Sequence, residues 1–312
     1  MLQVRAKILY NKKIKGNYFH LLLRAPKIAK ESIPGKFLMV QESIKHFPVY
    51  HLRKPLKAIA EGDFLDIKVN DANEPLLRRP LSIHRVKGDN IELLYEVVGR
   101  ATQILSRRKL GEYLDVIGPL GNGFNYPLSL PVRQAGAIRY PLPVLVAGGM
   151  GVAPLAFLAE KLAYSVERTA YRKEKGLKLS VKRYPLNAIV LIGAKTKDEI
   201  LCEKEFRNLG CDVKIATDDG SRGFKGKITD LLKALLLTMN YQLSTIYACG
   251  PRPMLKEISR ISKKYNIPAQ ASLEEHMACG IGVCLGCVVN TKDGFKRVCK
   301  EGPVFNADEI IW

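Results

Sequence analysis

The pattern of hydrophobic and polar residues changes its period near residue 143. Before that point, short runs of β-type residues alternate with polar turns that contain glycine or proline. The runs cover residues 3–10, 18–24, 36–41, 64–69, 90–97 and 113–117. Several short strands with such punctuation predict an antiparallel β-barrel.

Beyond residue 143, apolar strands alternate with helical segments. We expect strands at residues 144–147, 188–193, 213–216 and 245–249. We expect helices at residues 152–162, at 198–209, from residue 229 onward, and at 253–265. Strands that alternate with helices predict a parallel, doubly wound sheet.

The chain is therefore predicted to be a multi-domain protein. Its 312 residues, 47% of them hydrophobic, are enough for two or three domains with separate cores. We place an antiparallel β-barrel at residues 1–124 and a proline-containing linker at 125–142. A doubly wound α/β domain follows at 143–267, and a small C-terminal module at 268–312.

The net charge of +20 raises the question of a nucleic-acid partner. The positive charges are dispersed, and no DNA- or RNA-binding signature accompanies them, so we expect no nucleic-acid partner. Residues 164–187 hold seven Lys/Arg against two Glu. This segment is interpreted as a solvated helical extension; attraction to anionic cofactors or to an acidic partner is the alternative.

The N-terminal residues do not resemble a signal peptide, because no apolar run precedes their charges. The longest apolar stretch, residues 143–159, is interrupted by three glycines and a proline. It predicts a strand, a turn and a helix and not a membrane span. We therefore expect a cytoplasmic protein without membrane contact.

Four cysteines in the last fifth of the chain have the spacing C-x4-C-x2-C-x11-C. They are Cys279, Cys284, Cys287 and Cys299, with three glycines between the first and the third. This is the plant-type ligand pattern of a [2Fe-2S] cluster, and the glycines allow backbone N–H groups to approach inorganic sulfide. The alternatives are a zinc site, disulfides, or a C-x2-C redox pair. Three further cysteines at 202, 211 and 249 are scattered, and we expect buried free thiols there.

Two segments of the predicted barrel carry groups suited to a flavin nucleotide. Arg79 can pair with a pyrophosphate, and the hydroxyl of Ser82 can donate to a ring nitrogen. Thr102 opens a helical stretch and can present its hydroxyl and backbone N–H groups to phosphate. The plainer alternatives are a strand turn with an exposed arginine and an ordinary helix N-cap.

Three strand ends in the α/β region are suited to a dinucleotide. Gly148, Gly149 and Gly151 follow an apolar strand and open a helix, which offers bare backbone to a pyrophosphate, although the segment is not G-x-G-x-x-G. The Cys249-Gly250-Pro251 turn ends a later strand, where ligands of open sheets bind. Asp218 follows another strand and could accept hydrogen bonds from a ribose 2′-hydroxyl, which favours NAD over NADP; Arg222 and Lys195 leave this open.

The motifs R-P-L-S, G-P-L-G-N-G-F, G-G-M-G-V-A-P, D-D-G-S and C-G-P and the final cysteine run occur in one order. Together they resemble the electron-transfer subunit of class 1B dihydroorotate dehydrogenase, in the ferredoxin-reductase superfamily. The resemblance covers nearly the whole chain, and S-L-E-E-H-M-A-C-G at residues 272–280 is its most specific stretch. It implies a barrel that binds FAD, an α/β domain that binds NAD, and a C-terminal module that holds the [2Fe-2S] cluster.

The resemblance also implies roles for individual residues. Residues that would contact FAD are Arg79, Pro80, Leu81, Ser82, Leu94, Tyr95, Glu96, Ala101 and Thr102, the last two at its phosphates. The four cysteines would be the cluster ligands. Three positions depart from the family pattern: Glu96 and His276 replace arginines, and Ala101 replaces a glycine.

The resemblance further implies a redox relay. Electrons would pass from an FMN-containing dihydroorotate dehydrogenase catalytic subunit through the cluster and FAD to NAD, in a heterotetramer with two of each subunit. No catalytic acid or base toward dihydroorotate is expected in this chain. The alternatives are an NAD(P)H:ferredoxin-type reductase, an electron-transfer subunit of a hydrogenase or glutamate synthase, and a zinc-containing nucleic-acid-binding module.

Overall fold

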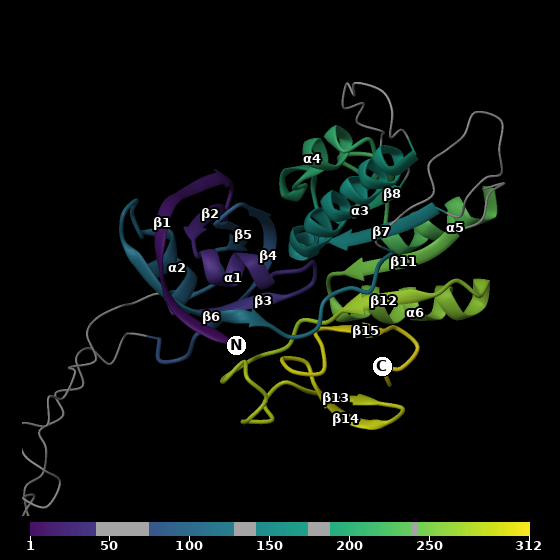
Figure 1. Cartoon of the computed structure of the whole chain (residues 1–312). Helices are drawn as coiled ribbons and strands as arrows, with labels where there is room; N and C mark the ends of the chain where they lie inside the picture. Colours follow the sequence, from purple (N-terminus) through teal and green to yellow (C-terminus); the bar gives the residue numbers. More distant parts are fainter. Residues whose placement is uncertain (42–74, 128–141, 174–187, 239–242) are drawn as a thin grey trace, which may run out of the picture.

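The computed structural model describes residues 1–41, 75–127, 142–173, 188–238 and 243–312, with side chains left out at 164–173. The predicted strand at 64–69, most of the predicted linker and most of the basic segment 164–187 lie outside the described residues. A barrel, an α/β layer and a small cysteine-rich region follow one another along the chain (Figure 1).

The N-terminal region is a closed six-stranded antiparallel barrel, as the sequence predicts. Its strands run in the order β1-β2-β5-β4-β3-β6. They are β1 (Leu2–Lys15), β2 (Tyr18–Arg24), β3 (Phe37–Gln41), β4 (Arg79–Lys87), β5 (Asn90–Glu96) and β6 (Tyr113–Leu120), with the short helices α1 (Pro26–Glu31) and α2 (Arg100–Ser106). Closure leaves no exposed strand edge.

One strand of the barrel departs from the prediction. The sequence leaves residues 78–83 between the expected strands at 64–69 and 90–97, but residues from Arg79 onward form β4. This strand pairs with β3 through Met39 and Pro80, and with β5 from Ile83 onward. Pro80 hides the strand in the sequence, since proline fits a strand only near its start or at an edge.

The second region is built on a seven-stranded sheet with the order β10-β9-β8-β7-β11-β12-β15. All neighbouring strands are parallel except the last pair, so the predicted doubly wound sheet is confirmed. The strands are β7 (Leu142–Gly148), β8 (Ile189–Ala194), β9 (Asp212–Thr217), β10 (Phe224–Lys225), β11 (Leu243–Cys249), β12 (Ala269–Ser272) and β15 (Val304–Asn306). The helices are η2 (Gly149–Gly151), α3 (Val152–Lys173), η3 (Lys197–Glu199), α4 (Glu203–Asn208), α5 (Ile228–Thr238) and α6 (Arg252–Tyr265).

The helix expected at residues 198–209 is interrupted. The chain forms η3, leaves the helix to bury Ile200 and Leu201, and re-enters it at α4. Cys202 precedes α4 with φ 58°, a left-handed conformation that ends any continuous helix. Burial of the two apolar side chains compensates for the interruption.

The C-terminal residues are joined to the α/β sheet and also form a separate hairpin. β13 (Val288–Thr291) and β14 (Gly294–Arg297) pair with each other below the sheet in Figure 1, and Thr291 of β13 also forms an isolated bridge with Ile310. β15 returns to pair with β12. The cysteine-rich loop is therefore anchored at both ends by the sheet, and the division at residue 268 stays a prediction.

The barrel and the α/β layer share buried side chains along α3. Phe157 of α3 is fully buried, and it packs into the barrel cluster that contains Ile83, Leu93 and Tyr95. The contact of α3 with β4 therefore fixes how the two regions meet.

In the described part of the chain, no helix is long and apolar enough to cross a membrane.

Replacement of Phe157 should measure this contact. We expect Phe157→Ala to lower the free energy of unfolding by about 3–5 kcal/mol, because it removes a buried aromatic ring and leaves a cavity. Urea unfolding followed by circular dichroism measures the change. Phe295→Ala is the control, since that ring is 78% exposed; equal midpoints for both variants would contradict this account of the interface.

Candidate cofactor sites

A cavity of about 560 Å³ lies between the barrel and residues 272–277, a volume within the range of ligand pockets. Eight of the nine residues predicted to contact FAD line it. They are Arg79, Pro80, Leu81, Ser82, Leu94, Tyr95, Glu96 and Thr102. The ninth, Ala101, is buried and is not among the lining residues.

Strand pairing explains why these residues meet. β4 and β5 are antiparallel neighbours, with Ile83 opposite Leu93, so Ser82 and Leu94 lie on adjacent strands at the same end. Ile83 points into the barrel core, and Ser82 therefore points away from it toward the cavity. Among the described residues that line the cavity, Arg79 is the only arginine or lysine.

The first turn of α2 is capped differently from the prediction. Gly99, and not Thr102, is the N-cap residue. The Thr102 hydroxyl accepts hydrogen bonds from the backbone N–H groups of Val98 (3.0 Å) and Gly99 (3.2 Å). That hydroxyl therefore holds the loop in shape, and the turn that it stabilises borders the cavity.

Sequence reasoning missed the far wall of this cavity, which residues 272–277 form. Glu274 is open to the cavity, but protein surrounds it on its other sides, and this desolvation raises the pKa of its carboxyl group. The Cys249 thiol lies 4.0 Å from its Oε1 atom. The S-L-E-E-H-M motif was the available signal, but it was used only to identify the resemblance.

A second cavity, of about 650 Å³, lies at the carboxyl ends of the parallel strands. Gly148 and Gly149 border it after β7, Asp218 after β9, and Pro251 after β11. This edge of an open sheet is where such folds bind ligands. The carboxyl ends of three strands thus bring together four of the residues predicted for NAD.

The other three predicted residues, Gly151, Cys249 and Gly250, do not line this cavity. A Cβ atom at Gly151 would lie 2.0 Å from the carbonyl oxygen of Cys249, and one at Gly250 would lie 3.0 Å from the Cα atom of Gly148. Glycine is required because the turns after β7 and β11 touch each other. These residues shape the edge of the sheet.

The sequence leaves open whether Lys195 and Arg222 could bind a 2′-phosphate near Asp218. The structure distinguishes these two cations. Lys195 lines the cavity. Arg222 does not line it, and its Nη2 atom lies 2.8 Å from Glu203. Of these two cations, Arg222 is thus already paired, although Lys227 and Lys233 line the cavity as well.

The two cavities meet at the short helix η2. Gly149 lines the cavity at the sheet edge, whereas Met150 lines the barrel cavity. One turn of backbone therefore borders both. This arrangement suits a nucleotide and a flavin whose reacting rings must approach each other.

The four cysteines lie in the loop between β12 and the C-terminal hairpin, and on that hairpin's return. The backbone N–H groups of Ile281 and Val283 each donate to Cys279 Sγ at 3.4 Å, and the Cys299 N–H donates to Cys287 Sγ at 3.4 Å. Positive φ angles at Gly280 (70°) and Gly282 (83°) turn these N–H groups toward sulfur. Donors aimed at thiolates are the arrangement that an iron–sulfur cluster needs.

The four thiols form two close pairs, Cys279 with Cys284 and Cys287 with Cys299. Although burial opposes the effect, N–H groups and the Cys284 thiol lower the pKa of Cys279 to about 6. Burial and the neighbouring Cys287 raise the pKa of Cys299 to about 12. Two close pairs fit two irons, whose positive charge would let all four sulfurs ionise together.

The spacing does not fit a single zinc ion. Four thiolates around zinc, each about 2.3 Å from the metal, would lie about 3.8 Å apart. Groups of three ligand atoms mutually within 4.8 Å occur in the described part of the chain, but none includes any of these four cysteines. The zinc alternative therefore loses its geometric support.

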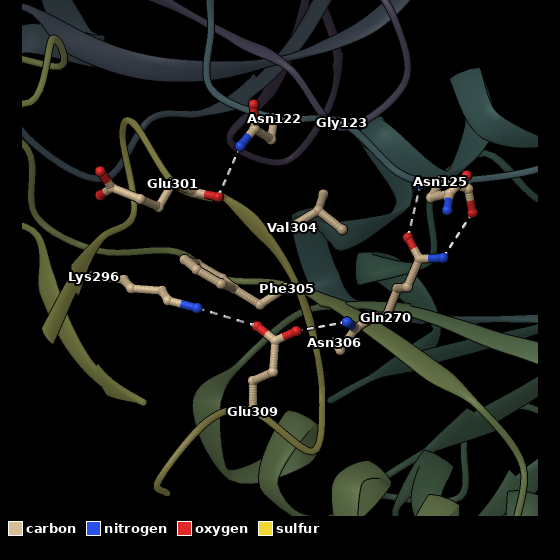
Figure 2. A pocket seen from close by; sticks show the side chains of 10 residues that line it. All are labelled: Asn122, Gly123, Asn125, Gln270, Lys296, Glu301, Val304, Phe305, Asn306 and Glu309. Atoms are coloured by element: carbon tan, nitrogen blue, oxygen red, sulfur yellow. Dashed lines mark hydrogen bonds and ion pairs between the residues drawn. The ribbon is translucent and has the colours of Figure 1, made fainter. Parts of the chain in front are cut away.

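A third cavity, of about 400 Å³, contains none of the predicted site residues (Figure 2). Its polar side chains largely satisfy one another. Gln270 exchanges hydrogen bonds with the Asn125 backbone at 2.8 and 2.7 Å, and Asn306 donates to Glu309 at 2.6 Å. Asn122 donates to the Glu301 carbonyl, so this region joins the barrel end to the C-terminal residues.

Comparison with known proteins agrees with this geometry. Residues 274–311 match the model of the iron-sulfur cluster binding domain of dihydroorotate dehydrogenase B, and residues 145–260 match that of an oxidoreductase NAD-binding domain. A solved structure of the NADH-dependent reduced ferredoxin-NADP oxidoreductase is similar, with a TM-score of 0.72 and 26% identity over 99% of this chain and 90% of that one. The ferredoxin reductase in carbazole 1,9a-dioxygenase shares the fold alone, with a TM-score of 0.54 and 18% identity over 86% and 67% of the chains.

The fold and the cavities define an oxidoreductase of the ferredoxin-reductase class. Two curated relatives are each described as a dihydroorotate dehydrogenase B (NAD(+)), electron transfer subunit. The protein from Desulforamulus reducens is 35% identical over 98% of this chain and 97% of its own, and that from Caldanaerobacter subterraneus subsp. tengcongensis is 32% identical over 99% of both. The chain belongs to the family of dihydroorotate dehydrogenase B electron transfer subunits, and the predicted FAD, [2Fe-2S] cluster and NAD are supported.

The raised pKa of Glu274 predicts a pH-dependent cost to stability. The folded state holds this proton more tightly than the unfolded state, so the cost is absent below about pH 4.5 and grows as the pH rises toward the folded-state pKa. We expect Glu274→Gln to raise the melting temperature near pH 8, with the gain shrinking toward pH 5. Thermal unfolding across this range measures it.

Glu275→Gln is the matched control, because Glu275 pairs with Arg252 at 2.9 Å and its removal should lose a little stability. A Glu274→Gln variant whose melting temperature follows the wild type at every pH would refute the assignment.

Proposed function

We propose that this chain carries electrons between an FMN-containing dihydroorotate dehydrogenase catalytic subunit and NAD. The observation that carries the proposal is the order of three adjoining sites: the cysteine loop, the barrel cavity and the sheet-edge cavity. The cysteine loop continues directly from residues 272–277, which line the barrel cavity, and that cavity meets the sheet-edge cavity at η2. Met277 and Cys279 are two residues apart, so their Cα atoms are separated by at most about 7 Å.

The residues of the barrel cavity are suited to hold FAD. Arg79 offers a guanidinium to a pyrophosphate, and its Nη1 atom donates to the backbone oxygen of Leu77 at 3.2 Å. Tyr95 and Leu94 give the cavity an apolar wall. FAD is the group that would join one-electron exchange with a cluster to two-electron exchange with a nicotinamide.

The residues at the sheet edge are suited to hold NAD. Gly148 and Gly149 offer backbone to the pyrophosphate at the start of η2 and α3. The carboxylate of Asp218 is placed to accept hydrogen bonds from a ribose and to repel a 2′-phosphate. The pairing of Arg222 with Glu203 supports NAD over NADP.

The partner would dock over the cysteine loop. Cys284 is exposed, and Val283 (73%) and Leu285 (61%) beside it are exposed apolar side chains. Cys287 and Cys299, in contrast, are buried against the core. Exposed apolar side chains around an electron-carrying site favour a protein partner there. We further infer that the assembly has two copies of each subunit and lies in the cytoplasm.

A ferredoxin-type reductase is the second candidate. The similar structure of the NADH-dependent reduced ferredoxin-NADP oxidoreductase favours it, because the same cofactor arrangement can serve another partner. The partner alone distinguishes the two functions, since every group named in this chain is common to both.

Co-expression with an FMN-containing catalytic subunit tests the proposed function. We expect dihydroorotate-dependent NAD reduction by the complex, and a loss of at least about 100-fold in Cys284→Ser, since a cluster ligand is removed. Cys211→Ser is the control, because this thiol is buried away from the loop. Full activity in Cys284→Ser would remove the cluster from the relay, and activity only with ferredoxin would favour the second candidate.

A charge on the exposed loop should separate docking from chemistry. We expect Leu285→Asp to weaken binding of the catalytic subunit at least about tenfold, while NADH oxidation by ferricyanide stays unchanged, because an apolar anchor is replaced by a charge. Leu110→Asp is the control, since Leu110 is similarly exposed (72%) but lies on the barrel. Equal affinities of both variants in a titration would place the partner elsewhere.

A further inference from the structure

His84 lies where the barrel and the α/β region meet, and its imidazole is fully buried. The Nδ1 atom lies 3.3 Å from the carbonyl oxygen of Ala153 in α3, and the Nε2 atom lies 3.1 Å from Oε2 of Glu205 in α4. One side chain of the barrel therefore contacts two helices of the other region. It lines neither of the two cofactor cavities.

A β-bulge explains how His84 reaches these helices. β4 and β5 shift register between Ile83 and Arg85, so His84 is an extra residue on β4. Successive side chains of a regular strand point to opposite faces, whereas a bulge redirects them. As a result, both His84 and its neighbour Arg85 contact the α/β region, Arg85 through Glu160 at 3.1 Å.

The contact with Ala153 connects His84 to the walls of both cavities. Ala153 and Met150 line the barrel cavity, and Gly149 lines the sheet-edge cavity. All three lie in η2 and the first turn of α3. Ser82, two residues before His84 on β4, lines the barrel cavity from the barrel side. The contact therefore ties a strand that borders one cavity to the turn that borders both.

The partners of the imidazole determine how it is held. A carbonyl oxygen can only accept, so the Nδ1–H group of His84 donates to Ala153. On the other side of the ring, burial opposes ionisation of Glu205, but His84 and Arg85 lower the pKa of its carboxyl group. Arg85 Nη2 donates to the same Oε2 atom at 2.8 Å. Contacts on both sides of the ring thus keep Nδ1 aimed at Ala153.

We propose that His84 is a positioning residue for hydride transfer between the nicotinamide and the flavin. Hydride transfer requires reacting atoms about 3–3.5 Å apart, and a displacement of about 1 Å can lower the rate about 100-fold. By holding the Ala153 carbonyl, His84 keeps the turn that borders both cavities at a fixed distance from β4. The inference rests on the proposed placement of FAD and NAD in the two cavities, and it adds a residue that contacts neither of them.

Two amide variants of similar size separate the two contacts of His84. The amide nitrogen of asparagine takes the place of Nδ1 and that of glutamine the place of Nε2, so His84→Asn keeps a donor for Ala153 and His84→Gln keeps one for Glu205. Anaerobic stopped-flow reduction of the bound flavin by NADH measures the hydride step in the cofactor-loaded chain. We expect this rate to fall at least about 10-fold in His84→Gln and to stay within about twofold of wild type in His84→Asn. The dissociation constant of NADH should change less than about threefold in both variants, because neither cavity loses a lining residue.

Glu160→Gln is the matched control, because it removes the ion pair of Glu160 with Arg85 from the same interface and leaves the Ala153 contact in place. We expect its flavin to be reduced within about twofold of the wild-type rate, even where its melting temperature falls. Hydrogen–deuterium exchange of residues 149–157, measured without NADH, gives a readout that does not depend on activity. Exchange there should be faster in His84→Gln than in the wild type, His84→Asn or Glu160→Gln.

The outcomes separate this proposal from the proposed function. Equal flavin reduction rates in His84→Gln and His84→Asn would overturn the positioning role of His84. An equal loss in Glu160→Gln would also overturn it, because the interface as a whole would then set the rate. A wild-type chain whose flavin NADH does not reduce would refute the placement of the two cofactors, and this inference with it.

Discussion

The pairing of β12 with β11 and β15 is the interaction on which the relay depends. It anchors the segment that leaves the sheet at Ser272, lines the barrel cavity through residue 277, and reaches the first thiol at Cys279. Because residues 272–279 form a short covalent path, the cysteine loop stays next to the cavity independently of the position of the β13–β14 hairpin. These two strand pairings hold the start of the cysteine segment against the sheet, and contacts of Asn122 with Glu301 and Gly302 hold its end against the barrel.

The three sites differ in their charged groups and in the pKa values of those groups. In the cysteine loop, burial raises the pKa of Cys299 to about 12, whereas N–H groups lower the pKa of Cys279 to about 6 against the effect of burial, so positive irons would favour ionisation of Cys299. The barrel cavity offers Arg79 to phosphate and places Glu274 opposite, where desolvation favours its neutral form. At the sheet edge, Asp218 and Lys195 line the second cavity. Each site thus carries the charge that its own cofactor requires.

Much of the fold and of the candidate sites could be predicted from local signals in the sequence. The spacing of the cysteines, the alternating periods of the two regions and the residues at strand ends are properties of short segments; the structure confirms the two fold regions, and four of the seven strand-end residues line the sheet-edge cavity. β4 was missed because Pro80 and two arginines hide its period, and its pairing partners lie elsewhere in the chain. The break at Cys202 was missed because only tertiary burial of Ile200 and Leu201 explains it.

Contacts between distant residues were beyond the reach of the sequence. His84 and Glu205 are 121 positions apart, and Cys249 and Glu274 are 25 positions apart. No periodicity or spacing relates such pairs. The packing of α4 against the barrel brings His84 and Glu205 together, and the pairing of β11 with β12 brings Cys249 to Glu274.

Electron continuity between the nucleotide and the cysteine loop is the central claim, and anaerobic reduction by NADH tests it most directly. Oxidised [2Fe-2S] clusters give no electron paramagnetic resonance signal, whereas singly reduced ones do. We expect NADH to bleach the flavin absorbance and produce the reduced-cluster signal in the wild-type chain, and to bleach the flavin alone in Cys284→Ser. Flavin reduction without any cluster signal in the wild-type chain would contradict the account.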